Sequence, residues 1–153
     1  MLSNKTKYAL KAVVALARDY GKGPVLISEL ARNEHLPKKF LELILLELKN
    51  KRILDSKKGK GGGYMLSRPP ENISLGEVVR VMEGPLAPLP CVSQTAYKRC
   101  QECVDEQLCE VRLVMKEVRD ATAKILDHRT LRDALEQAES AKNQSRENLY
   151  YQI

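Results

Sequence analysis

All four cysteines of the chain lie in one short stretch, CVSQTAYKRCQECVDEQLC, which spans residues 91–109. The intervals between Cys91, Cys100, Cys103 and Cys109 are eight, two and five residues. Four thiols so close together could form two disulfides, bind zinc, hold an iron-sulfur cluster or act as a redox switch. Zinc and both common cluster types accept four thiolates, so the spacing alone does not separate these chemistries.

The composition favours a reducing compartment for these thiols. The chain of 153 residues suffices for one ordinary domain, or for a small domain with an oligomerisation element. No apolar run approaches the roughly eighteen residues that a membrane span needs, and the start, MLSNKTKYALK, lacks an apolar signal segment. We therefore expect a cytoplasmic protein without a membrane partner. In that compartment, clustered cysteines bind metal or do redox chemistry more often than they form structural disulfides.

Basic residues are concentrated in the first half of the chain. Residues 1–68 hold 15 Lys or Arg against 6 Asp or Glu, a net charge of +9, and the remainder holds 11 against 14, a net charge of −3. This asymmetry favours a polyanionic partner such as DNA, although a solvated basic surface has the same composition. No HExxH, Ser-His-Asp or nucleotide-binding pattern is present, so we do not expect an enzyme.

The basic half is predicted to contain a helix-turn-helix. A first amphipathic helix lies between Ser3 and Gly21, because apolar residues recur there at three-to-four spacing. A short helix over 29–34, with Ser28 before it, and a helix over about 38–51 are separated only by HLP. The polar side of the last helix carries Lys38, Lys39, Glu42 and Lys49. Leu46 falls near that side, so the helix is either covered there or makes an apolar contact.

A hairpin with a glycine-rich tip is predicted next. Two strand-prone segments, 53–57 and 64–67, flank the loop KGKGGG. A phosphate-binding loop would need a Lys-Ser/Thr pair and a following helix, and both are missing. The hairpin is therefore predicted to be the wing of a winged helix, with glycines that let its tip enter a minor groove and lysines that contact phosphates. A winged-helix interaction module that does not bind DNA is the alternative.

A short helix precedes the cysteines, and a long amphipathic helix follows them. Ser74 and Glu77 predict a capping box at the start of SLGEVVRVMEG, which Gly84 ends. The long helix, of about twenty residues, carries a heptad-like seam that favours pairing with a second copy over packing on its own domain. The expected dimer seam consists of Leu108, Val111, Met115, Val118, Thr122 and Ile125.

The predicted fold class is therefore mainly α: a winged helix-turn-helix DNA-binding domain with a two-stranded wing, plus a long dimerisation helix. The DNA-binding domain covers residues 1–70, and the short helix with the cysteine loop covers 71–106. The dimerisation helix and a short C-terminal helix, capped by Thr130, cover 107–141. The tail, 142–153, ends in ENLYYQI, which resembles a protease site left by an expression tag, and is set aside.

The segments LSNKTKYALKA, ISELARNEHLPKKFLELILLELKNKRIL and KKGKGGGYMLSRPPENISLGEVVRVMEG, followed by the cysteine loop, resemble in this order the Rrf-type family of bacterial winged-helix transcription regulators. The resemblance covers roughly residues 1–140 and implies a homodimer that binds double-stranded DNA through helix and wing. Glu42 could accept a cytosine amino proton, or pair with Lys38 or Lys39. The expected DNA-binding residues are Lys5, Tyr8, Ser28, Lys38, Lys39, Glu42, Lys49, Lys57, Lys58, Lys60, Gly61 and Gly62.

The resemblance also implies a use for the cysteines. Many members of the family hold an iron-sulfur cluster between the short and long helices, on three cysteines and a variable fourth ligand, and others hold none. Where some members have a ligating His this chain has Arg112, and where others have an Asp it has Lys7. Neither side chain substitutes as a ligand, but one extra cysteine is present.

The resemblance therefore favours an all-thiolate iron-sulfur site, with two or four irons, on Cys91, Cys100, Cys103 and Cys109. Zinc and metal-free thiols remain alternatives, and Cys100 or Cys103 could be spare. Lys98 and Arg99 could lower the pKa of the neighbouring thiols and offset the negative charge of a cluster, or they could simply belong to a solvated basic loop. Assembly or loss of the metal centre could then shift the two recognition helices of a dimer relative to each other.

Overall fold

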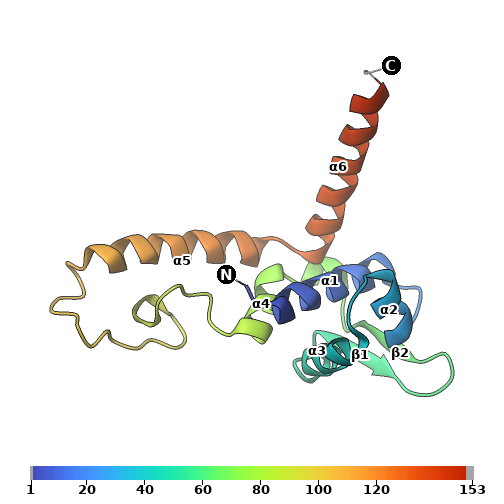
Figure 1. Ribbon diagram of the computed structural model, residues 1–153, viewed down its shortest axis with the longest axis horizontal. Helices are drawn as coiled ribbons and strands as arrows, with labels where there is room; N and C mark the ends of the chain where they lie inside the picture. Colours follow the sequence, from blue (N-terminus) through green and yellow to red (C-terminus); the bar gives the residue numbers. More distant parts are fainter. Residues whose placement is uncertain (1, 151–153) are drawn as a thin grey trace.

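The computed structural model describes residues 2–150 and confirms a mainly helical winged-helix fold (Figure 1). Residues 84–109 form a long and largely irregular segment that contains all four cysteines. The elements, in chain order, are α1 (Asn4–Arg18), α2 (Ile27–Asn33), α3 (Lys38–Asn50), β1 (Leu54–Lys57), β2 (Gly63–Leu66), the 3₁₀ turn η1 (Pro70–Asn72), α4 (Leu75–Glu83), the 3₁₀ turn η2 (Pro90–Val92), α5 (Glu110–His128) and α6 (Leu131–Tyr150).

The hydrophobic core joins the helix-turn-helix to α1, α4 and the start of α6. Fully buried residues come from α1 (Val13), α3 (Leu45) and α4 (Val78), and Leu131 of α6 completes the same cluster. The predicted boundary at residue 70 therefore cuts through this core. The reason is the amphipathic α4, whose apolar face must be covered and packs against α1.

Side-chain caps fix three of the helix starts, and those at Ser74 and Thr130 were predicted. The hydroxyls of Ser3 and Ser74 accept hydrogen bonds from backbone amides at the first turns of α1 and α4. Thr130 does the same for Asp133 in α6. In contrast, Ser28 is not a cap: α2 begins one residue before it, at Ile27, and its N-cap, Leu26, makes no side-chain hydrogen bond.

The wing is a two-stranded antiparallel sheet that a third segment extends. Leu54 pairs with Leu66 and Lys57 with Gly63, so the turn lies over residues 58–62. On the other edge of β2, Val25 and Tyr64 exchange two backbone hydrogen bonds, of 2.8 and 2.9 Å. The pair joins the wing to the segment that leads into α2. Helix-turn-helix and wing are thereby held together by backbone contacts.

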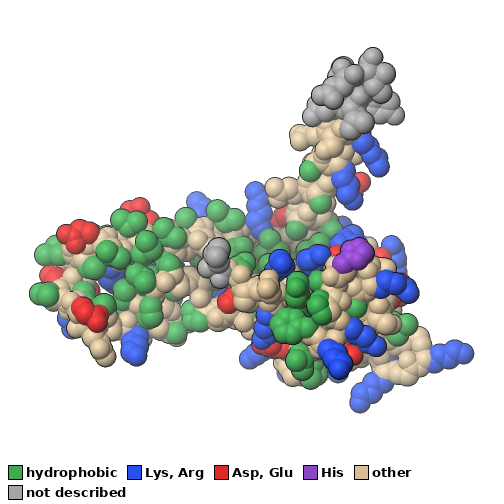
Figure 2. All heavy atoms as spheres, viewed as in Figure 1, with side chains coloured by type: hydrophobic (Ala, Val, Ile, Leu, Met, Phe, Trp, Pro, Cys, Tyr) green, Lys and Arg blue, Asp and Glu red, His purple; other side chains and the backbone are tan. Residues whose placement is uncertain are grey.

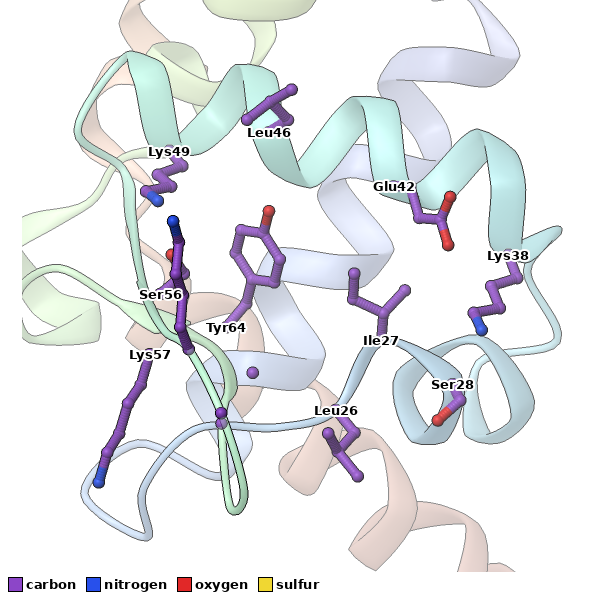
Figure 3. A pocket seen from close by; sticks show the side chains of 14 residues that line it. Leu26, Ile27, Ser28, Lys38, Glu42, Leu46, Lys49, Ser56, Lys57 and Tyr64 are labelled. Carbon is purple, nitrogen blue, oxygen red and sulfur yellow. The ribbon is translucent and has the colours of Figure 1, made fainter.

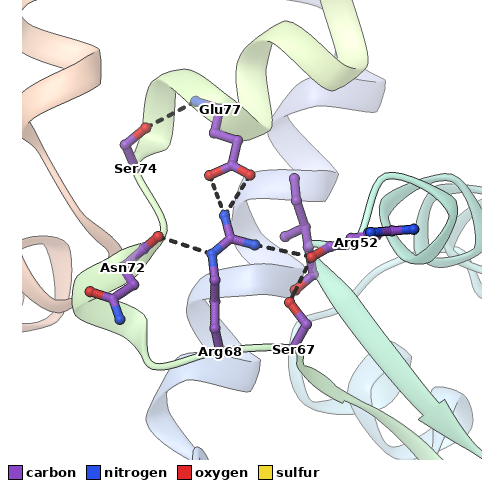
Figure 4. Close-up of polar contacts among 7 residues, drawn as sticks. Arg52, Ser67, Arg68, Asn72, Ser74 and Glu77 are labelled. Atoms are coloured by element: carbon purple, nitrogen blue, oxygen red, sulfur yellow. Dashed lines mark hydrogen bonds and ion pairs between the residues drawn. The ribbon is translucent and has the colours of Figure 1, made fainter.

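Arg68 fixes the base of the wing to α4 (Figure 4). Its guanidinium lies 2.5 Å from both carboxylate oxygens of Glu77 and donates to the carbonyl oxygens of Asn72 and Arg52, at 3.1 and 3.0 Å. Only the Ser74 half of the predicted capping box forms, because the Glu77 carboxylate is engaged by Arg68 instead of the amide of Ser74.

Glu83, at the end of α4, binds the start of α1. Its carboxylate accepts hydrogen bonds from the Ser3 amide at 2.6 Å and from the buried Thr6 hydroxyl at 2.5 Å. These bonds stabilise the charged form, so the pKa of Glu83 is lowered to about 2.

We expect this carboxylate to make stability depend on pH. A group with a lowered folded-state pKa contributes stability above its unfolded pKa and loses that contribution as the pH falls through the interval down to about 2. The urea midpoint of the wild type should therefore exceed that of Glu83→Gln at pH 7, and the difference should narrow below about pH 4.5. A difference that stays constant from pH 7 to pH 3 would contradict the assignment.

The last two helices leave the winged-helix unit in different directions (Figure 1). α5 runs alongside the cysteine segment, and α6 projects away from the core after its first turns. The predicted short helix is too short, because α6 continues to Tyr150. Residues 131–146 contain no Gly or Pro and are rich in Ala, Glu, Gln, Lys and Arg, which favours continuation. Within residues 2–150, no helix is long and apolar enough to span a membrane.

Candidate DNA-binding surface and cysteine loop

One face of α3 points away from the core into a groove beside the wing. Lys38, Glu42, Leu46 and Lys49 are spaced by four, four and three residues, so they share this face. Figure 3 shows them along α3, with Ser56, Lys57 and Tyr64 of the wing across the groove. The groove has a volume of about 620 Å³ and is lined by Leu26, Ile27, Ser28, Lys38, Glu42, Leu46, Lys49, Ser56, Lys57, Lys58, Gly59, Gly62, Gly63 and Tyr64.

Glycine is required in the wing because backbones approach closely there. A Cβ atom on Gly62 would lie 2.3 Å from the carbonyl oxygen of Lys57. On Gly63, where φ is +146°, it would lie 2.2 Å from the carbonyl oxygen of Val25. The glycines therefore allow the tight turn of the wing and its contact with the segment before α2. The sequence had suggested another reason for them, namely entry of the wing tip into a minor groove of DNA.

The groove is strongly cationic. Lys38, Lys49, Lys57 and Lys58 line it, and Glu42 is the one acidic residue among its lining side chains. Glu42 forms no ion pair with any other side chain of residues 2–146, so the predicted alternative of a pair with Lys38 or Lys39 is not formed. Its carboxylate is exposed and can accept hydrogen bonds from a ligand in the groove.

Seven of the twelve predicted DNA-binding residues line this groove, and five lie outside it. Lys39 is exposed on α3 next to it, and Lys60 and Gly61 are exposed in the turn of the wing. Lys5 instead forms an ion pair with Glu47 of α3, at 2.5 Å. Tyr8 is half-buried and packs edge-on against Phe40, with ring centroids 5.8 Å apart. The seven residues in the groove are Ser28, Lys38, Glu42, Lys49, Lys57, Lys58 and Gly62.

Five further lining side chains were not predicted as part of the site. Leu46 is one turn beyond Glu42, and its spacing had placed it near this face without assigning it to the site. The others come from the start of α2, with its N-cap, and from the wing, and the pairing of Val25 with Tyr64 brings these two segments together. The five are Leu26, Ile27, Leu46, Ser56 and Tyr64.

The cysteines do not share one site as the loop is arranged. Cys91 lies in η2, Cys100 is exposed, and Cys103 and Cys109 are half-buried. Among the side chains of residues 2–146, no three Cys, His, Asp or Glu groups come close enough to share one metal ion. The donor set itself fits an iron-sulfur cluster or zinc, because four thiols lie on one loop of little regular structure. Binding would require this loop to rearrange.

The expected lowering of the thiol pKa values is wrong for two of the cysteines. A hydrogen bond from the Cys100 thiol to the Glu102 carboxylate, at 3.0 Å, raises the pKa of Cys100. Partial burial, with Cys109 and Glu106 nearby, raises the pKa of Cys103, and Arg99 opposes this only in part. The hydrogen bond to Glu102 at Cys100, and burial at Cys103, therefore outweigh the effect of the neighbouring cations on the thiol pKa values.

Arg112 connects the two ends of the cysteine loop. Its guanidinium donates to the carbonyl oxygen of Cys91 at 3.3 Å and to that of Glu106 at 3.2 Å. The Tyr97 hydroxyl donates to the carboxylate of Glu106 as well. Arg112 thus holds the loop against α5 from the position where the resemblance implied a ligand in other members.

The exposed face of α5 is apolar (Figure 2). Val111, Val114, Val118 and Ile125 are between 44% and 62% exposed. Val114 was absent from the predicted seam, yet helical periodicity puts it on this face. Of the other predicted seam residues, Met115 is half-buried, Thr122 is exposed, and Leu108 is exposed but lies before α5.

Residues 2–137 match the family Rrf2, described as an iron-dependent transcriptional regulator. An rrf2-like HTH-type transcriptional regulator of Rhodobacter capsulatus is 41% identical over 138 residues, which are 88% of this chain and 92% of the relative. The HTH-type transcriptional regulator CymR of Bacillus subtilis is 31% identical over 132 residues, which are 86% of this chain and 87% of the relative.

Two solved structures share the architecture at similar lengths. The structure of CymR, the global cysteine regulator of B. subtilis, has a TM-score of 0.74 at 29% identity and covers 88% of this chain and 95% of its own. The structure of T. potens IscR has a TM-score of 0.74 at 29% identity, and the match covers 92% of this chain and 90% of the IscR chain. Since the family match extends from the first turn of α1 into α6, and two regulators are similar along most of both chains, this winged-helix chain belongs to the Rrf2 family of transcriptional regulators.

Proposed function

We propose that the chain is a homodimeric DNA-binding transcription regulator that senses through an iron-sulfur cluster on its four-cysteine loop. The observation that carries the DNA-binding part is the cationic groove between α3 and the wing, in a chain of the Rrf2 family. α3 would enter the major groove and the wing tip the adjacent minor groove.

The residues in the groove have different roles in this proposal. The lysines Lys49, Lys57 and Lys58 neutralise phosphates and so fix the position of the protein on the duplex. These phosphate contacts do not distinguish one base sequence from another. Glu42 accepts a hydrogen bond from the amino group of a cytosine in the major groove, and its lack of an ion-pair partner among the side chains of residues 2–146 supports this role. Lys38, at the start of α3, serves a phosphate or a guanine.

The test of DNA binding is its salt dependence. With four groove lysines in each subunit, a dimer bound to duplex DNA should show a slope of log K against log salt of about −7 if all eight meet phosphates. Lys49→Ala should make the slope shallower by about 2, because each dimer loses two contacts. Lys142→Ala on the exposed part of α6 is the matched control and should leave it unchanged. Binding without salt dependence would instead support an interaction module.

Homodimerisation through α5 is proposed from its exposed apolar face. A contiguous row of valine and isoleucine side chains in water is unusual for a monomer and typical of a protein interface. The face turns away from the helix's own cysteine loop, which packs on the Arg112 side. A second α5 across a two-fold axis would cover it and would place two α3 helices for two half-sites.

The cluster is proposed to lie on Cys91, Cys100, Cys103 and Cys109. A bound iron-sulfur cluster would supply an iron-dependent, oxidation-sensitive group to the loop. The second candidate is a zinc-stabilised or cluster-free thiol-redox regulator of the same fold, and its metal-free form is favoured because no three of the thiols within the described residues come close enough to share a metal ion. A small thiol or another external ligand could complete the site if Cys100 or Cys103 does not bind.

The contacts of α5 suggest how the loop would act on DNA binding. The C-terminal end of α5 is fixed to α4, because Arg80 pairs with Asp127 at 2.5 Å and the Leu75 amide donates to the Arg129 carbonyl oxygen at 2.8 Å. Its N-terminal end follows the cysteine loop directly. A change in loop shape would therefore tilt α5 about the α4 contact and alter the distance between the two α3 helices of a dimer.

A further inference from the structure

A single leucine interrupts the charged face of α3. Leu41, Ile44, Leu45 and Leu48 of this helix are almost fully buried, whereas Leu43 is 65% exposed but does not line the groove. Leu46 is 47% exposed and lies between Glu42 and Lys49 on the face that lines the groove. Its side chain lies outside the core, on the side of α3 that borders the groove (Figure 3).

The chemistry of the groove restricts what this leucine can contact. The lysines around it attract a polyanion, and an apolar side chain gains nothing from phosphates or from polar base edges. The major groove of DNA offers one apolar group, the C5 methyl of thymine, which an aliphatic side chain can bury. Burial of that methyl against Leu46 would remove apolar surface of both partners from water.

We infer that Leu46 is a specificity-determining residue that recognises a thymine methyl in each half-site. The inference rests on the proposed DNA-binding function and adds a base preference to it. Glu42, one turn earlier on the same face, would select a cytosine amino group nearby. The operator half-site should therefore contain a thymine that is required for its methyl group and not only for its pairing with adenine.

The test removes the methyl group alone. Duplexes selected from a random library by the wild-type protein are resynthesised with uracil in place of thymine, one symmetrical pair of positions at a time. At one pair, the affinity of the wild type should fall about fourfold for each methyl removed. The Leu46→Ala variant should bind the thymine duplex with an affinity reduced by the same factor. Its affinity should not change further when uracil replaces thymine at that pair of positions.

Leu43→Ala is the matched control. Leu43 is 65% exposed on the same helix but does not line the groove, so its removal should leave the response to uracil as in the wild type. Both changes truncate an exposed side chain, and thermal unfolding of each variant verifies the fold.

If Leu46→Ala responds to uracil as strongly as the wild type, or if no thymine position responds at all, the inference is wrong while DNA binding stands. If the wild type selects no duplex and shows no salt-dependent binding, the proposed function fails and the inference with it.

Discussion

Replacing Val118 of α5 by glutamate is expected to convert the dimer into monomers and to lower the affinity for a two-half-site operator by more than about a hundredfold. Val118 is 44% exposed in the single chain, so the carboxylate is tolerated there in water. In a two-fold interface the same change would bury two like charges near each other without partners. The large loss in DNA affinity follows because a monomer binds each half-site independently.

The measurements are sedimentation velocity for the mass of the assembly and fluorescence anisotropy for operator binding at fixed salt. Lys116→Glu is the matched control, because it introduces the same carboxylate on α5 at an exposed position away from the apolar row. It should remain a dimer with nearly unchanged affinity. A wild-type protein that sediments as a monomer at micromolar concentration would refute the dimer, and a Val118→Glu dimer would refute the role of this face.

Local signals in the sequence predicted the helices well because their causes are local. Caps at Ser3, Ser74 and Thr130 act within one turn, and the three-to-four periodicity of α3 and α5 is set by neighbours along the chain. The start of α2 was misplaced for the opposite reason. Val25 pairs with Tyr64, nearly forty residues away in sequence, and this pairing decides where the chain turns into the helix.

The candidate site was predictable where it depends on one helix and not where it depends on contacts between elements. The α3 face could be derived from spacing, including Leu46. Lys5 and Tyr8 could not be placed, because their partners Glu47 and Phe40 become neighbours only when α1 packs on α3. The thiol pKa values were misjudged because the sequence shows adjacent charges but not which of them forms a hydrogen bond with a given thiol, as Glu102 does with Cys100.

Removal of a single ligating thiol is expected to abolish binding of the metal centre. After anaerobic reconstitution the wild type should contain iron and sulfide and absorb visible light, whereas Cys91→Ser and Cys109→Ser should retain less than roughly a tenth of that iron. Cys100→Ser and Cys103→Ser, tested separately, show whether one of the pair is spare. Gln101→Ala lies between these two cysteines, carries no metal ligand and should keep the full iron content.

The same proteins test whether the loop regulates DNA binding. Because the loop and α5 are joined directly and α5 is fixed to α4 by the Arg80–Asp127 pair, loss of iron should change operator affinity by about fivefold to a hundredfold. Arg80→Ala, which releases the fixed end of α5, should reduce this difference while leaving the iron content unchanged. Equal operator affinity of the iron-loaded and iron-free wild type would show that the centre is structural and not regulatory.

The metal content after reconstitution decides between the cluster and its alternatives. A colourless protein with stoichiometric zinc would support the zinc-stabilised regulator, and a protein that takes up neither metal would support the thiol-redox regulator.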